Sequence, residues 1–169
     1  DILDENNRLS LILSTSNGVF QIPNSMGLQP TGVSGVTGLG PNGVLKAGTT
    51  YLYPSESLNE NQREITHFGV ASWQHSSGNF DIQTSLVVRY SSLNFYPDEL
   101  GDLLYDGIGQ MASKADTAYG IQTDAAYQFS DTHTLRAGFY LQNDKASSRT
   151  SSQVLPVNAA GFQTSTNPL

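Results

Sequence analysis

Apolar and polar residues alternate along several stretches of the chain, and this alternation is its strongest structural signal. The clearest stretch covers residues 80–92, where the odd positions are polar except for Val87. The even positions are Phe80, Ile82, Thr84, Leu86, Val88 and Tyr90. A period of two predicts a strand with one apolar and one polar face.

The same pattern predicts two hairpins with very short polar turns. The first covers residues 65–96 and turns at 76–79, and the second covers residues 117–144 and turns at 130–132. Residues 8–14 predict a further strand, so we expect about five antiparallel strands in an all-β fold. The facing of residues 65–75 stays ambiguous, because Phe68 and Val70 share one face while Ala71 and Trp73 share the other.

Long polar segments connect these strands at the ends away from the short turns. Glycine and proline interrupt residues 15–62 too often for regular structure, and residues 31–43 are nearly a low-complexity glycine loop. Residues 96–114 predict an acidic loop with a short helix over 98–105, and no strand is expected beyond residue 145. Short turns on one side and long extracellular loops on the other are typical of a transmembrane β-barrel wall.

Strand length and facing support this interpretation. The predicted strands have about 11 or more residues, whereas soluble strands average ~5–6 and barrel strands need ~9–11 to cross a bilayer. Asp81, Arg89, Asp124 and Arg136 lie on polar faces suited to a water-filled or plugged lumen. The side chains expected to face lipid are Phe80, Ile82, Leu86, Val88, Tyr119, Ile121, Tyr127, Phe129, Leu135, Phe139 and Leu141.

Aromatic residues gather beside the short turns. Trp73 and Phe80 flank the first turn, and Tyr127 and Phe129 precede the second. Aromatic girdles mark the two interfaces of membrane barrels, although aromatic side chains also favour strands in general. Five strands cannot close a lipid-facing barrel, since the smallest use about eight. The preferred interpretation is therefore an internal fragment of a larger barrel, consistent with a first residue, Asp1, that is not Met.

Composition excludes several classes of function. The chain of 169 residues has a net charge of −7 and no basic patch, which argues against binding nucleic acid. It has no cysteine, and no apolar run is long enough for a membrane-spanning helix. His67, His75 and His133 are scattered, so we expect no metal site, and the absence of a G-x-S-x-G motif leaves a hydrolase triad without an anchor. We expect no enzyme and no cofactor.

Two groups of charged residues remain as binding candidates. Arg89 and Arg136 are candidate lumen contacts to an anionic ligand, against the alternative that each pairs with a wall acid such as Asp81 or Asp124. The acids of the 96–114 loop are candidate contacts to a ligand or a divalent ion, against the favoured alternative of a solvated loop face. These four acids are Asp98, Glu99, Asp102 and Asp106.

Four segments carry a resemblance to a known family. DENNRLS at residues 4–10, SNGVFQIPN at 16–24, FGVASWQHS at 68–76 and RYSSL at 89–93 resemble the barrel region of TonB-dependent outer-membrane receptors. The resemblance covers essentially the whole chain, residues 1–169. It lies in the general character of the sequence and not in one specific motif. It differs from the complete pattern in lacking a plug domain, a TonB-contacting box and a terminal strand that ends in an aromatic residue.

The resemblance implies a 22-stranded barrel around an N-terminal plug in the outer membrane of a Gram-negative bacterium. Such receptors import scarce ligands, such as iron–siderophore complexes, with energy from the TonB complex. The partners implied are outer-membrane lipid, the rest of the barrel and plug, the TonB complex and a small-molecule ligand. Ligand identity and the number and order of missing strands are not encoded in this segment.

Two alternatives belong to other classes. The first is a soluble extracellular β-sandwich that acts as an adhesin or carbohydrate-binding module, although sandwich turns recur every ~8–12 residues and the two short turns here are much further apart. The second is a small porin-like oligomer in which several chains close one wall.

Overall fold

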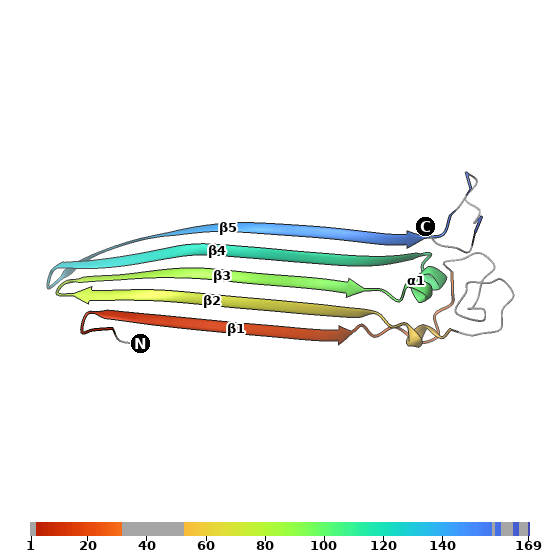
Figure 1. The fold of residues 1–169 in the computed structure, drawn as a ribbon, viewed down its shortest axis with the longest axis horizontal. Helices are drawn as coiled ribbons and strands as arrows, with labels where there is room; N and C mark the ends of the chain where they lie inside the picture. Colours follow the sequence, from red (N-terminus) through yellow and green to blue (C-terminus); the bar gives the residue numbers. More distant parts are fainter. Residues whose placement is uncertain (1–2, 32–52, 157, 160–163, 166–168) are drawn as a thin grey trace. The chain divides into compact units, whose positions relative to one another are not determined.

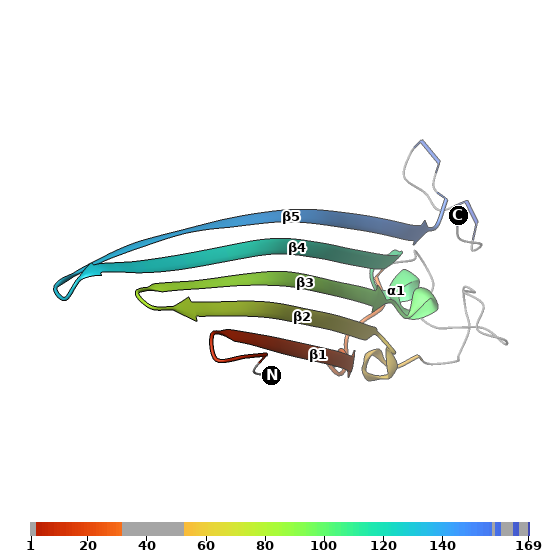
Figure 2. The ribbon, with the colours of Figure 1, turned by 60° about the vertical axis from the view of Figure 1, so that its left-hand side comes forward.

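The computed structural model describes the chain except for residues 1–2, 32–52, 157, 160–163 and 166–168. The described fold is all-β, with five antiparallel strands in one open sheet. The strands are β1 (Asn7–Gln21), β2 (Asn61–Ser77), β3 (Phe80–Tyr96), β4 (Ile108–Ser130) and β5 (His133–Val154). Each strand lies beside its neighbour in the sequence, in the order β1-β2-β3-β4-β5 (Figures 1 and 2).

Both predicted hairpins are confirmed. β2 turns into β3 through Gly78 and Asn79, and Gly78 has a φ of 57°, a left-handed conformation that glycine adopts without strain. β4 turns into β5 through Asp131 and Thr132. The strands have 15 to 23 residues, so they are even longer than the sequence pattern predicts.

Several predicted strand boundaries are wrong, because the strands extend beyond their predicted ends. β1 continues to Gln21 and β4 begins at Ile108, in segments expected to be loops. β5 continues to Val154, where no strand was expected. Serine and threonine dominate the β5 extension, and backbone pairing with the neighbouring strand holds it without an alternating apolar face. The glycine-rich segment 32–43 lies outside the described residues.

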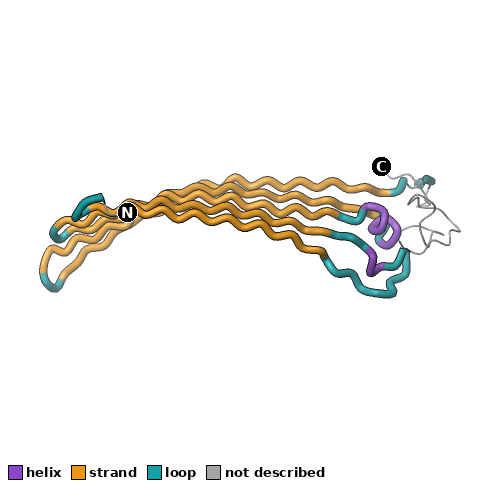
Figure 3. Tube along the Cα trace, turned by 60° about the horizontal axis from the view of Figure 1, so that its bottom comes forward, coloured by secondary structure: helices purple, strands orange, loops and turns teal. Residues whose placement is uncertain are grey.

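A short helix, α1 (Glu99–Tyr105), connects β3 to β4 (Figure 3), as the sequence predicts. Asp98 caps it, because its side chain accepts a hydrogen bond from the Gly101 backbone N–H. A single 3₁₀ turn, η2 (Ser55–Ser57), precedes β2.

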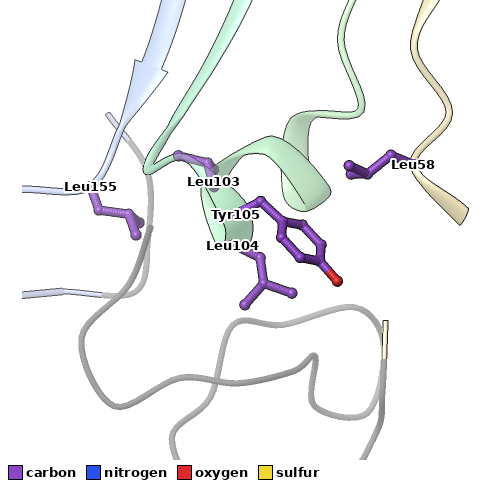
Figure 4. Packing of buried hydrophobic residues seen from close by; sticks show 5 residues of the cluster. All are labelled: Leu58, Leu103, Leu104, Tyr105 and Leu155. Atoms are coloured by element: carbon purple, nitrogen blue, oxygen red, sulfur yellow. The ribbon is translucent and has the colours of Figure 1, made fainter. Parts of the chain in front are cut away.

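The chain divides into two compact units. Unit 1 consists of residues 1–18, 64–92 and 114–147, and unit 2 of residues 19–63, 93–113 and 148–169. The hydrophobic cluster of buried residues lies in unit 2 and consists of Leu58, Leu103, Leu104, Tyr105 and Leu155 (Figure 4). Among the described residues of unit 1, by contrast, the one apolar side chain that is buried is Ala118.

Candidate functional site

Cross-strand contacts fix which side chains of unit 1 share a face of the sheet. The hydroxyls of Thr84 and Thr123 lie 3.2 Å apart on one face, and those of Ser72 and Ser85 lie 2.8 Å apart on the other. A Cβ atom on Gly69 would lie 3.2 Å from Val88 Cγ1, so Gly69 belongs to the face of Thr84. Because side chains alternate along a strand, these contacts assign the positions of β2, β3 and β4. Leu13 Cδ2, 3.3 Å from the same Cβ, assigns β1, and Asp124 Oδ1, 2.6 Å from a Cβ on Gly138, assigns β5.

The face that carries Thr84 is the apolar face of unit 1. All eleven side chains predicted to face lipid lie on it, and nine of them are exposed, including Leu86 (58%), Phe129 (60%) and Leu141 (64%). The ambiguity in β2 is resolved, because Ala71 and Trp73 lie on this face together with Gly69. The described residues therefore leave a large apolar surface without cover.

Charged residues are almost confined to the opposite, polar face. Lys145 is the exception among the strand residues of unit 1. The charged side chains of the polar face are Arg8, Glu64, Asp81, Arg89, Lys114, Asp116, Asp124, Arg136 and Asp144. Such segregation on a thin sheet means that the two faces suit different surroundings.

A row of polar side chains crosses the apolar face at one level, and we call it the polar row. The Thr15 hydroxyl lies 2.9 Å from His67 Nδ1, and the His67 ring stacks on Tyr90 with 6.0 Å between centroids. The register that pairs Thr84 with Thr123 and Asn94 with Ser113 places Thr117 opposite Tyr90. Lys145 follows on β5 and completes the row. The alternation rule alone did not reveal this row, although Thr15, His67 and Lys145 interrupt the apolar pattern.

A second polar and aromatic boundary lies beside the short turns, and we call it the turn rim. Asn7 Oδ1 accepts a hydrogen bond from Trp73 Nε1 at 3.1 Å and lies 2.9 Å from His75 Nδ1. Trp73 stacks on His75, and Phe129 stacks on His133. Phe80 and Tyr127 complete this rim.

Between the polar row and the turn rim lies an apolar band. Its polar members are Thr84 and Thr123, whose hydroxyls lie 3.2 Å apart, and Asn143 on β5. The apolar and aromatic members are Leu9, Leu11, Leu13, Ala71, Ile82, Leu86, Val88, Tyr119, Ile121, Ala125, Ala137, Phe139 and Leu141.

The polar face holds the two arginines that the sequence singled out. Arg89 pairs with the wall acid Asp116 at 2.9 Å, so the pairing alternative holds for Arg89, although its partner is neither Asp81 nor Asp124. Arg136 lines an open hollow of about 450 Å³ together with Asp81, Gln83 and Asp124. The structure therefore separates the two arginines into different surroundings.

The acidic loop of unit 2 is not a uniformly solvated face. The Asp98 side chain accepts hydrogen bonds from the Tyr53 hydroxyl and from the Asn59 backbone N–H, which ties α1 to the segment before β2. Asp102 is only 6% exposed, contrary to the expectation of a solvated acid. Its Oδ1 atom has no hydrogen-bond partner among the described residues.

Burial and neighbouring acids change the acidity of this loop. Desolvation, together with the negative charge and hydrogen bond of Glu60, raises the pKa of the Asp102 carboxyl from 3.8 to about 7. Burial and the hydrogen bond to Asp98 raise the pKa of the Tyr53 hydroxyl above its ordinary value. Asp102 therefore holds a proton in conditions where an ordinary carboxyl is ionised.

Three further observations bear on the classes of function. No group of three or more His, Asp or Glu side chains among the described residues is placed to hold a metal ion. None of the described helices has the length and apolar character to span a membrane. Comparisons with protein-family models, with curated proteins and with solved structures gave no match.

Proposed function

We propose that the chain forms part of the wall of a transmembrane β-barrel, with the apolar band facing lipid. The observation that carries this proposal is the exposed, charge-free apolar band of unit 1, bounded by the turn rim and by the polar row. In water, large exposed apolar surfaces mark interaction sites or aggregation hazards. In hydrocarbon, the same surface is favourable and the charges opposite it stay in an aqueous interior.

The height of the band supports the proposal. Ten residues separate Phe80 at the turn rim from Tyr90 in the polar row. At ~3.3 Å per residue this is ~33 Å along the strand, or ~25 Å along the membrane normal for a tilt near 40°. The apolar band of a membrane barrel is ~25 Å tall and carries aromatic residues at both borders.

The open edges of the sheet require further strands. β5 has 22 residues and lies at one edge, and β1 lies at the other, so each has one side without a strand partner in the described sheet. Unpaired backbone N–H and C=O groups cost several kcal/mol each in hydrocarbon, so the part of each edge that lies in the membrane must be paired. The rest of the barrel wall is the partner that this geometry requires.

Within this class, we favour a TonB-dependent receptor of the outer membrane of a Gram-negative bacterium, as the resemblance of residues 4–10, 16–24, 68–76 and 89–93 suggests. The chain would then take part in uptake of a scarce ligand such as an iron–siderophore complex, together with a plug and the TonB complex. Arg136 is the better candidate for a ligand contact, because the Arg89 guanidinium is engaged by Asp116.

Refolding of the 169-residue chain tests the membrane assignment. The strands are expected to form in detergent or lipid and not as a soluble monomer, as measured by circular dichroism and size-exclusion chromatography. Trp73, the single tryptophan, is expected to be quenched by lipids with brominated acyl chains. A soluble monomer with a cooperative melt and no quenching would instead support a β-sandwich.

A further inference from the structure

One of the troughs in the apolar band has Gly69 at its floor. The trough has a volume of about 330 Å³ and is lined by Leu13, Thr15, His67, Gly69, Val88 and Tyr90. A Cβ atom at Gly69 would lie 3.2 Å from Val88 Cγ1 and 3.3 Å from Leu13 Cδ2, so the missing side chain is what opens the trough.

The end of the trough that lies beside the polar row is itself polar. The His67 ring has Thr15 on its Nδ1 side and Tyr90 against its face. When the Thr15 hydroxyl donates to Nδ1, the neutral ring carries its proton on Nε2 and presents it as a donor. The Tyr90 hydroxyl is a second donor, on a side chain that is 38% exposed.

Lys145 adds positive charge to the same row. It lies two strands from Tyr90, which corresponds to about 10 Å at the usual spacing between strands. The other ionised side chains of the unit 1 strands lie on the opposite face. An amphiphile seated here would therefore meet apolar walls along its chain, and two hydrogen-bond donors and a cation at its head.

We propose that the Gly69 trough is a binding site for an anionic phospholipid. One acyl chain lies over Gly69 between Leu13 and Val88, and the phosphate accepts hydrogen bonds from His67 and Tyr90. This inference deepens the proposed function and rests on it, because it names the lipid class that one part of the apolar band selects.

Native mass spectrometry of the chain in detergent micelles, titrated with phosphatidylglycerol, tests the site. Gly69→Leu fills the trough. The double variant Thr15→Val/His67→Phe removes the His67 donor and the Thr15 hydroxyl that contacts its ring, and it keeps their volume. Ala71→Leu is the matched control, since Ala71 lies two residues from Gly69 on the same strand and face but outside the trough.

We expect one phosphatidylglycerol to bind wild type and Ala71→Leu equally, and about tenfold more weakly to both test variants, as for the loss of ~1.4 kcal/mol. Wild-type affinity in either test variant, or an equal loss in Ala71→Leu, overturns the site. If Gly69→Leu does not fold, the double variant alone decides.

The two proposals fail in different ways. If the wild-type chain is a soluble monomer and brominated lipid leaves Trp73 fluorescence unchanged, the membrane wall itself is wrong. If Trp73 is quenched in all variants but their phosphatidylglycerol affinities are equal, the barrel-wall proposal is retained and the lipid-site proposal is rejected.

Discussion

Arg89 and Asp116 form an ion pair across β3 and β4, with the Arg89 Nη2 atom 2.9 Å from Asp116 Oδ2. The Arg89 side chain is 48% exposed and that of Asp116 is 26% exposed. Solvent screens a pair of this kind, so its contribution to stability is small. The ion pair matters mainly for function, because Asp116 engages the Arg89 guanidinium, which the sequence indicates as a candidate ligand contact.

A double-mutant cycle measures this pair directly. We expect Arg89→Gln, Asp116→Asn and the double variant to give a coupling energy below ~1 kcal/mol, because solvent-exposed pairs fall in that range. Urea unfolding of the chain refolded in detergent is the measurement. A coupling above ~3 kcal/mol, as for breaking a buried pair, would show that the polar face is closed to water.

The buried Asp102 carboxyl makes the stability of unit 2 depend on pH. Its folded pKa is raised above the ordinary value of 3.8, to about 7. The folded state therefore binds the proton more tightly than the unfolded state does. The stabilisation is full below pH 3.8 and is lost as the pH rises through about 7.

Asp102→Asn isolates this effect, since the amide is neutral at every pH. We expect hydrogen exchange at the α1 amides, corrected for intrinsic rates, to show wild type losing protection between pH 5 and pH 8 relative to the variant. Glu99→Gln is the matched control, because Glu99 is an exposed acid in the first turn of the same helix and is not among the groups that raise the Asp102 pKa. An equal pH dependence in wild type and Asp102→Asn would contradict the assignment.

Gly101 allows α1 to approach the segment before β2. A Cβ atom there would collide with Leu58 Cδ2 and lie 3.0 Å from the Tyr53 ring and 3.1 Å from Asp98 Cγ. We expect Gly101→Ala to destabilise unit 2 by ~1–3 kcal/mol, as overpacking does elsewhere. Proteolysis of the α1 region should rise accordingly. Leu100→Ala, on an adjacent and more exposed residue, should leave the proteolysis rate nearly unchanged.

The face assignments could be predicted from the sequence because they depend on local periodicity. Residues such as Ile82, Leu86 and Ile121 alternate with polar neighbours, and a strand places every second side chain on one face. β2 could not be assigned in this way, because Phe68 and Val70 compete with Ala71 and Trp73. The contacts of Gly69 with Leu13 and Val88, which come from other strands, resolve it.

The ends of the strands and the burial of Asp102 could not be predicted for a different reason. Serine-rich extensions such as the last part of β5 form strands because a neighbouring strand pairs with them, and pairing is not local in sequence. Asp102 is buried because Leu58 and Tyr53, more than forty residues earlier, pack around α1. The acidic composition of the loop alone predicts solvation.

The assignment of the apolar band to lipid predicts opposite responses to the same substitution on neighbouring residues. Leu86 lies in the middle of the apolar band, whereas Ser85 lies on the polar face, where its hydroxyl bonds Ser72. A lysine facing hydrocarbon near the bilayer midplane costs ~2–4 kcal/mol, and one facing an aqueous interior costs little.

We therefore expect Leu86→Lys to lower the free energy of unfolding of the chain in lipid bilayers by ~2–4 kcal/mol, and Ser85→Lys by less than ~1 kcal/mol. Urea titration in phosphatidylcholine bilayers, followed by Trp73 fluorescence, is the measurement. Ser85→Lys is the matched control in the same bilayers, because it places the same charge on the adjacent residue but on the opposite face of the sheet. If Ser85→Lys proves the more damaging change in bilayers, the polar face is the one that meets lipid, and the apolar band must be covered by protein.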